Sequence, residues 1–250
     1  MSELTVTVTD NGTGKSIELP VLKSVHGPDV VDIRKLYEEL GYFTYDPAYT
    51  STASCQSKIT FIDGGKGVLL YRGYPIEQLA ERSSFMEVAY LLIYRKLPTR
   101  DELDEFSSSI TKHMLLDESL LNFYDGFHYD AHPMAMVTAV MGSLSAFYHN
   151  KIDITDSHHR EQVAAHTIAK IPTIAAVAYK HMAGCPVVYP QTKHSYCGNL
   201  LSMLFALPTE EYEINPIAEK ALDQLLILHA DHEQNASTST VRLAGSTGTN

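Results

Sequence analysis

The sequence predicts a mainly α-helical protein, preceded by a small N-terminal β-rich module. Before Gly73, apolar residues recur with a period of two, which is typical of half-buried strands. After Gly73 the period becomes 3.6, which is typical of amphipathic helices. With 250 residues, of which 44% are hydrophobic, the chain can bury a sizeable core. We therefore expect a β-rich module over residues 1–60 and an α-helical body over residues 61–250.

Two β-hairpins are expected in the N-terminal part of the chain. Residues 4–9 and 17–21 both alternate between apolar and polar side chains, and Asn11-Gly12 between them favours a tight turn. A similar pattern surrounds the glycines in residues 58–72, which predicts the second hairpin.

Helix start signals follow one another through the rest of the sequence. Two capping boxes, Ser84 with Glu87 and Thr99 with Glu102, predict helix starts, because each pair satisfies free N–H groups in a first turn. Pro133 suits the first turn of a helix that runs to Tyr148. Pro172 and other prolines and glycines divide the rest into predicted helices at 157–170, 172–182, 195–206 and 215–232.

Composition excludes several classes of function. The net charge is −11 and no dense Lys/Arg cluster is present, so we expect no nucleic-acid partner and no membrane partner. The N-terminus lacks the order of a signal peptide, and the longest apolar stretch, 134–147, is too short to span a bilayer. Cys55, Cys185 and Cys197 form no C-x-x-C pair. These features predict a reduced, cytoplasmic protein without a disulfide framework.

The segment LILHADHEQNASTSTVR, residues 226–242, contains the candidate binding histidines. On a continuous helix, Ile217, Leu225, Leu228 and His232 would share one face. We therefore expect His232 to point in the buried direction at the C-terminal end of this helix. The partial negative charge there favours a protonated imidazole, which could meet a small anionic ligand. His229 would lie about 60° round the same helix.

Residue patterns leave the role of this segment open. His229 and His232 could share a metal ion, although no third or fourth ligand is evident, so we expect no metal site. His232 could equally be a hydrogen-bonded core histidine. Gly64-Gly65-Lys66-Gly67 lacks phosphate-loop spacing, and no G-x-S-x-G motif supports a serine nucleophile. The residues alone thus indicate a histidine-bearing site near position 232, without a reaction.

A family resemblance adds the reaction. The strings FTYDPAYTSTASCQSKITFIDGGKGVLLYRGYPIEQLA, HPMAMV, AFYH, KIPTIAA and LILHADHEQNASTSTVR resemble the N-terminal part of bacterial type II citrate synthases, from one end of the chain to the other. The β-rich start favours type II over type I and methylcitrate synthases. The resemblance implies a multi-helical citrate synthase large domain, incomplete here, without the small domain.

The resemblance implies that the family's chemistry uses three substrates and no cofactor. Acetyl-CoA condenses with oxaloacetate and water to give citrate and CoA, as the first step of the tricarboxylic acid cycle. By resemblance, His232 binds oxaloacetate and His229 supports it in the same wall. The family's enol-stabilising histidine lies in a G-P-x-H-G segment, which this sequence lacks. We therefore expect no catalytic residue in this chain, a truncated sequence, and no activity from residues 1–250 alone.

Some type II enzymes are hexamers that NADH inhibits at a separate site. His113, Met114, Tyr148 and Lys170 resemble positions of that site. Three positions depart from it: Lys112 and His166 replace arginines of the inhibited enzymes, and Thr209 replaces a reactive cysteine. Lysine and histidine cannot reproduce the bidentate contacts of arginine, so NADH control is an open prediction.

The resemblance also implies a homodimer or hexamer when the protein is full length. The alternative is a non-catalytic helical subunit that binds a dicarboxylate or a nucleotide and regulates a partner.

Overall fold

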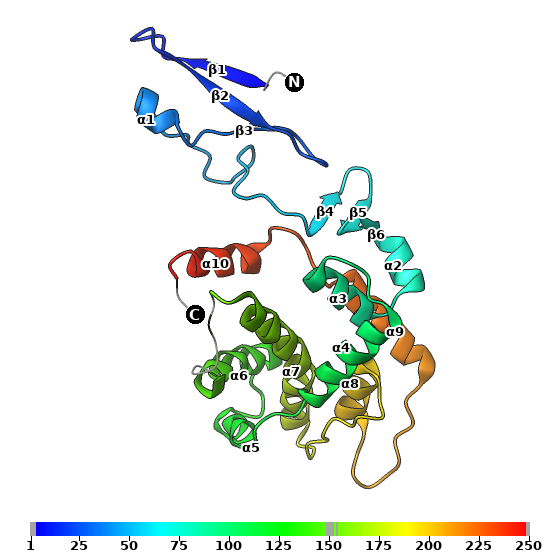
Figure 1. Ribbon diagram of the computed structural model, residues 1–250. Helices are drawn as coiled ribbons and strands as arrows, with labels where there is room; N and C mark the ends of the chain where they lie inside the picture. The colour runs from blue at the N-terminus through cyan, green and yellow to red at the C-terminus, as the bar shows by residue number, and fades with distance from the viewer. Residues whose placement is uncertain (1–3, 149–152, 154, 249–250) are drawn as a thin grey trace. The chain divides into compact units, whose positions relative to one another are not determined.

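The computed structural model describes residues 4–148, 153 and 155–248, and it confirms the mainly α-helical fold with small N-terminal sheets (Figure 1). Internal contacts divide the chain into two compact units, residues 1–69 and 70–250. The boundary falls inside strand β5 (Val68–Tyr71). Each unit is described here by itself.

The N-terminal unit is built around the first predicted hairpin, which is confirmed. Strand β1 (Thr5–Thr9) pairs antiparallel with β2 (Ser16–Leu22), from Thr5↔Pro20 to Thr9↔Ser16. Asp10 caps the connecting loop by accepting a hydrogen bond from the Gly12 N–H at 2.8 Å, and Gly14 supplies a left-handed residue with φ +74°. Strand β2 also pairs with β3 (Val30–Val31), and helix α1 (Leu36–Leu40) follows. Strand β4 (Thr60–Asp63) occupies the first arm of the region predicted as a second hairpin.

The second unit begins with a tight hairpin and three short helices. The last residues of β5 pair antiparallel with β6 (Tyr74–Pro75). Helices α2 (Ile76–Arg82), α3 (Phe85–Tyr94) and α4 (Arg100–Lys112) follow. Both predicted capping boxes are present at the starts of α3 and α4, and Pro133 begins α6, as predicted.

Helix α7 lies at the centre of the second unit. The remaining elements are α5 (Glu118–Leu121), the 3₁₀ helix η1 (Asn122–Gly126), α6 (Pro133–Tyr148), α7 (Ser157–Ala183), α8 (Tyr196–Phe205), α9 (Pro216–Leu228) and α10 (Ala236–Gly245). Ala169 and Ala176 of α7 belong to a core cluster with α3, α4 and α8. Ile174 and Val177 belong to a second cluster with α5, η1 and α6. One helix therefore joins both cores.

The predicted break at Pro172 is wrong, because α7 runs through it as a single helix of 27 residues. Proline removes the hydrogen bond to the carbonyl four residues earlier, which here belongs to Ile168. The buried phenol of Tyr196 donates to that carbonyl at 2.8 Å. A side chain from α8 thus replaces the missing helical donor, and the helix continues.

Helix α10 was not predicted, because its sequence is rich in Ser and Thr. Asn235 caps it by accepting from the Thr238 N–H at 2.9 Å. Inside the helix, the Thr240 hydroxyl donates to the Ala236 carbonyl at 2.8 Å, so the polar side chain does not compete with the helix. His149, the last residue of the AFYH string, lies outside the described residues. Among the described helices, none is long and apolar enough to cross a membrane.

Candidate functional site

The His232 segment begins where α9 ends, and α9 ends earlier than the sequence predicts. The expected helix to His232 is wrong: α9 stops at Leu228 and His229 is its C-cap. The His229 Nδ1 lies 2.7 Å from the Leu225 carbonyl oxygen, which also accepts from the His229 N–H at 3.1 Å. His232 therefore lies in the loop of residues 229–235 between α9 and α10.

His232 is exposed, so the expectation of a buried direction is also wrong. The helical face chosen from the sequence is the solvent face of this chain, where Ile217 is 80% exposed and Leu225 is 52% exposed. The buried direction belongs to Ile227, which is fully buried, and to Leu222 and Leu226, which pack against a core cluster. Apolar residues occupy two faces of α9, and periodicity alone does not show which face packs.

The loop that carries His232 is nevertheless well defined by hydrogen bonds. The Asp231 carboxylate accepts from the Glu233 N–H at 2.9 Å, and the Asn235 N–H donates to the Glu233 carbonyl at 3.1 Å. Glu233 adopts a left-handed conformation with φ +41°. The phenol of Tyr71 contacts the backbone of Asp231 from the other side. An exposed imidazole on a hydrogen-bonded loop is suited to receive a ligand from solvent.

The four residues of the candidate effector site come together in the second unit. The Lys170 ammonium donates to the carbonyls of His113 at 3.0 Å and Leu115 at 2.9 Å, and it lies 5.6 Å from the centre of the Tyr148 ring. Met114 is fully buried, and its carbonyl accepts from the Thr173 hydroxyl at 2.8 Å. The cluster joins the end of α4 to α6 and α7.

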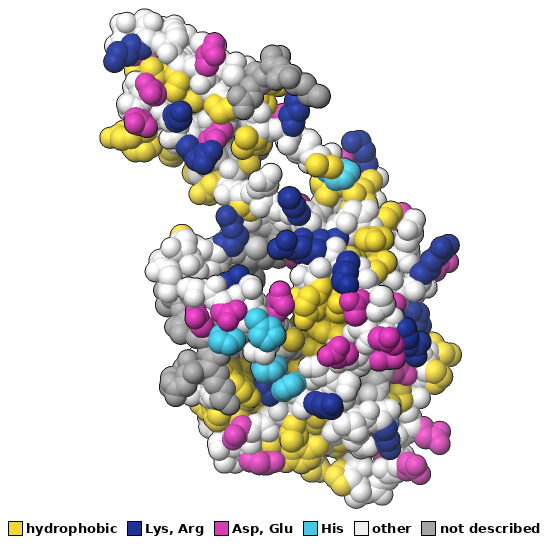
Figure 2. All heavy atoms as spheres, viewed as in Figure 1, with side chains coloured by type: hydrophobic (Ala, Val, Ile, Leu, Met, Phe, Trp, Pro, Cys, Tyr) yellow, Lys and Arg dark blue, Asp and Glu magenta, His cyan; other side chains and the backbone are white. Residues whose placement is uncertain are grey.

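A pair of imidazoles lies at the same cluster. The rings of His113 and His166 have centroids 4.3 Å apart, and His166 also lies 6.4 Å from the Tyr148 ring. Lys112 is exposed and lines the cavity described below. Figure 2 shows histidine side chains gathered on one face of the helical unit. Lys170 is only 5% exposed and donates to two carbonyls that follow α4, so it links the end of α4 to α7.

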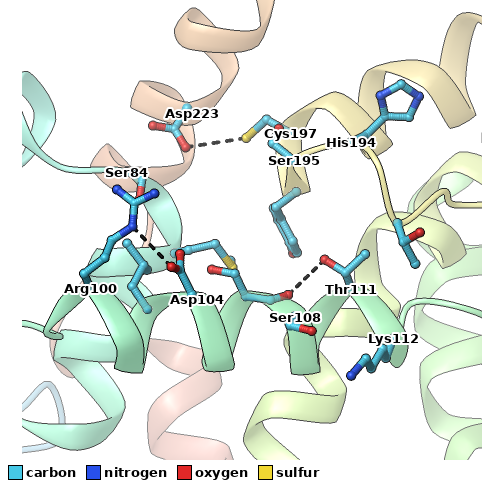
Figure 3. A pocket seen from close by; sticks show the side chains of 15 residues that line it. Ser84, Arg100, Asp104, Ser108, Thr111, Lys112, His194, Ser195, Cys197 and Asp223 are labelled. Carbon is cyan, nitrogen blue, oxygen red and sulfur yellow. Dashed lines mark hydrogen bonds and ion pairs between the residues drawn. The ribbon is translucent and has the colours of Figure 1, made fainter.

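A cavity of about 500 Å³ opens elsewhere in the same unit, between α4, the start of α8 and α9 (Figure 3). On its α4 wall, Arg100 pairs with Asp104 at 3.2 Å. His194 also lines it, and burial lowers the pKa of this imidazole. Charged side chains of both signs therefore line the cavity.

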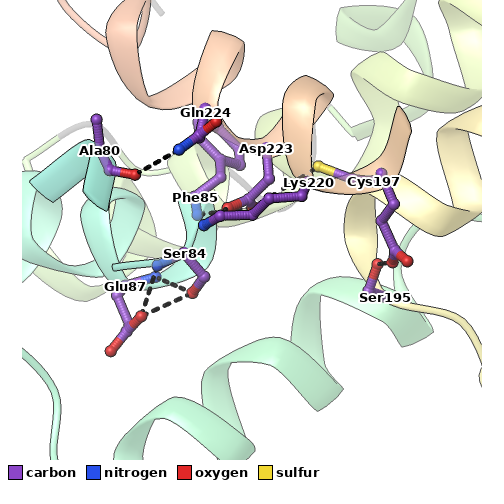
Figure 4. Close-up of polar contacts among 10 residues, drawn as sticks. Ala80, Ser84, Phe85, Glu87, Ser195, Cys197, Lys220, Asp223 and Gln224 are labelled. Atoms are coloured by element: carbon purple, nitrogen blue, oxygen red, sulfur yellow. Dashed lines mark hydrogen bonds and ion pairs between the residues drawn. The ribbon is translucent and has the colours of Figure 1, made fainter. Parts of the chain in front are cut away.

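Asp223, which also lines this cavity, takes part in a hydrogen-bond network that joins neighbouring helices (Figure 4). Its carboxylate accepts from the Phe85 N–H at 3.0 Å and from the Cys197 thiol at 3.7 Å. Burial and the neighbouring Asp223 raise the pKa of Cys197 to about 12, so this thiol is a poor nucleophile. Ser195 donates to Glu219 and caps α8 through the Gly198 N–H. The network joins three helices and uses Cys197 as a hydrogen-bond donor.

Within residues 4–148, 153 and 155–248, no three His, Cys, Asp or Glu side chains are placed to hold a metal ion together. Residue patterns missed Tyr71, which lies next to the histidine segment in space but 160 residues away in sequence. No local signal in the sequence could have connected the two.

The family model described as "Citrate synthase, C-terminal domain" matches residues 48–250, most of the sequence. The chain therefore belongs to the citrate synthase family.

Solved citrate synthases show the same fold. The enzyme from Thermotoga maritima MSB8 is 28% identical, with a TM-score of 0.69 over 83% of this chain and 52% of that chain. The enzyme from Pyrobaculum aerophilum is 30% identical, with a TM-score of 0.69 over 92% of this chain and 54% of that one. The enzyme from Thermoplasma acidophilum, solved as a ternary complex with carboxymethyl coenzyme A and oxaloacetate, is 27% identical, with a TM-score of 0.74 over 80% and 51%. The chain thus spans about half the length of these relatives.

Proposed function

We propose that the chain is the N-terminal part of a bacterial type II citrate synthase and contributes the oxaloacetate-binding segment around His232. The complete enzyme would condense acetyl-CoA with oxaloacetate and water to give citrate and CoA. The family match over residues 48–250 carries the proposal, and it favours an enzyme over a non-catalytic regulatory subunit. The Thermoplasma relative, whose complex holds oxaloacetate and a coenzyme A derivative, supports the choice of substrates.

The proposed role of His232 is to donate a hydrogen bond to oxaloacetate. Its ring is exposed on a loop whose backbone is held on both sides, so little order has to be gained when a ligand binds. His229 Nδ1 lies within hydrogen-bond distance of the Leu225 carbonyl and so supports the end of α9. The assignment of the binding role to His232 and the supporting role to His229 is taken from the family resemblance.

Isothermal titration of residues 1–250 with oxaloacetate tests this role. We expect weak, saturable binding that His232→Ala abolishes. The matched control is His128→Ala, which removes another exposed histidine outside the segment. Equal affinity in wild type and His232→Ala would show that His232 is not a substrate ligand, and absence of wild-type binding would remove the substrate assignment.

Condensation itself should require groups that the resemblance places outside this sequence. We expect purified residues 1–250 to release no free CoA from acetyl-CoA and oxaloacetate above a blank. A thiol-reporting assay measures this release directly. Activity clearly above the blank would contradict the proposal that the catalytic residues lie elsewhere.

We further propose that the cluster of His113, Met114, Tyr148 and Lys170 is an NADH effector site. Its support is the meeting of all four residues at the junction of α4, α6 and α7. Since inhibited enzymes have arginine where His166 stands, His166→Arg should tighten NADH binding. His158→Arg, at the exposed start of α7, is the control. Absence of heat with millimolar NADH in both wild type and His166→Arg would exclude the site.

The proposed enzyme is a cytoplasmic homodimer or hexamer in its full-length form. Sedimentation equilibrium of the protein from its natural source would measure the assembly, and mass spectrometry of the denatured protein would measure the subunit mass. A subunit mass above 27.8 kDa would support the truncation, and a subunit mass equal to it would contradict it.

A further inference from the structure

Tyr71 contacts the backbone of the His232 segment through a single buried phenol. The side chain is fully buried, and its hydroxyl donates to the Asp231 carbonyl at 3.0 Å. The same oxygen accepts from the Asp231 N–H at 3.3 Å. The Leu228 carbonyl, at the end of α9, lies 3.4 Å away. One hydroxyl therefore fixes both peptide groups of the residue before His232 and locates them against the helix end.

Tyr71 is itself held in a rigid position. It is paired with Tyr74 across the β5–β6 hairpin, whose two turn residues, Arg72 and Gly73, have φ of +52° and +89°. Positive φ at both positions is typical of a type I′ turn, in which arginine is strained. The Arg72 guanidinium donates to the Leu92 carbonyl at the end of α3 at 2.5 Å. The turn is thus anchored to a helix, and the phenol has a fixed base.

The other neighbour of His232 is fixed independently. The Asp231 carboxylate holds the Glu233 N–H at 2.9 Å, so hydrogen bonds constrain the backbone on both sides of His232. The imidazole remains exposed. Without a ligand, the loop backbone would therefore already hold the imidazole in an exposed position. A ligand would not have to order the loop when it binds.

We infer that Tyr71 is a positioning residue for the substrate segment: its hydroxyl sets the backbone at Asp231 and so directs His232 toward the dicarboxylate substrate. The identity of the substrate in this inference rests on the proposed function. The positioning of the backbone rests only on the hydrogen bonds described above. Burial raises the pKa of the Tyr71 phenol, so it stays a neutral donor and acceptor at physiological pH. The inference predicts that the hydroxyl affects substrate affinity without touching the substrate.

The test compares Tyr71→Phe with Tyr124→Phe in residues 1–250. Tyr124 is also buried, and its phenol donates to the Ile174 carbonyl at 2.8 Å, far from the loop in sequence. Both variants keep the ring and lose one buried hydroxyl. In Tyr71→Phe we expect faster amide hydrogen exchange over residues 229–235 and about fivefold weaker oxaloacetate binding, because the ligand would then have to order a loop that has lost the restraint of about one net hydrogen bond. In Tyr124→Phe both should remain at wild-type values.

The two measurements separate the inference from the proposed function. Unchanged exchange over residues 229–235 in Tyr71→Phe would overturn the positioning role, whatever the affinity. Unchanged oxaloacetate affinity, in a protein whose wild type binds it, would overturn the link to substrate. If wild type binds no oxaloacetate, the proposed function and the substrate part both fail, while the exchange result still decides the positioning. Equal loosening in Tyr124→Phe would show general destabilisation and would also overturn the inference.

Discussion

The continuity of α7 through Pro172 depends on one hydroxyl, and this dependence can be measured. Tyr196→Phe removes the phenol that donates to the Ile168 carbonyl at 2.8 Å and keeps the buried ring. Since Pro172 has no N–H, that carbonyl would lose its replacement donor. An unsatisfied buried carbonyl costs about 1–3 kcal/mol, so we expect the free energy of unfolding to fall by about 2 kcal/mol.

A double-mutant cycle with Pro172→Ala isolates this interaction. In the Pro172→Ala background, the new N–H at position 172 can donate to Ile168 as in an ordinary helix. Tyr196→Phe should then cost about 1–2 kcal/mol less than in wild type, because the carbonyl is no longer left without a donor. The cycle subtracts the packing and helix-propensity effects of Pro172→Ala itself.

Urea unfolding followed by far-ultraviolet circular dichroism is the appropriate assay, because the long helices lie in the unit that contains α7. The slopes with urea should agree among the four proteins, so that the free energies are comparable. If the two substitutions are additive within about 0.5 kcal/mol, the phenol does not compensate for the proline and the explanation is wrong.

Three further outcomes follow from the same structure. Burial raises the pKa of Cys197 to about 12, so this thiol should resist alkylation of the native protein at pH 8, while the less buried Cys185 should react. Equal labelling of the two cysteines, measured by mass spectrometry, would contradict this. Lys96 and a backbone hydrogen bond lower the pKa of Glu102 from 4.5 to about 2. The contribution of Glu102 to the free energy of unfolding is therefore present above pH 4.5 and is lost as the pH falls through 2. In Glu102→Gln the free energy of unfolding should depend less on pH in that window. Lys170→Met should lower the free energy of unfolding by about 2 kcal/mol, because the carbonyls of His113 and Leu115 lose their donor. An unchanged midpoint of thermal unfolding would show that these hydrogen bonds do not stabilise the chain.

Features whose energy comes from a few consecutive residues were predicted correctly. The capping boxes at Ser84 and Thr99 form within four residues, and the sequence shows every partner. The first hairpin depends on alternation and a short loop, which are also local. Pro172 shows where this reasoning fails, since its effect on α7 is decided by Tyr196, 24 residues later. Sequence patterns show that a proline removes a donor, but not whether a distant side chain supplies another.

The incorrect prediction that His232 is buried on a helix has a different origin, and it matters more for the proposed function. Helical periodicity placed His232 on the apolar face that includes Ile217, and it assumed that α9 continues to position 232. In the structure, α9 ends at Leu228, and the Tyr71 phenol lies 3.4 Å from the Leu228 carbonyl oxygen, which a further helical turn would have satisfied. A buried histidine on a helix would have been oriented by packing. An exposed histidine in a loop must be oriented by the backbone, and the hydrogen bonds around Asp231 supply that orientation. The helix end therefore leaves His232 in an exposed loop, and the Tyr71 phenol that contacts the last carbonyl of α9 also holds the backbone of the residue before His232.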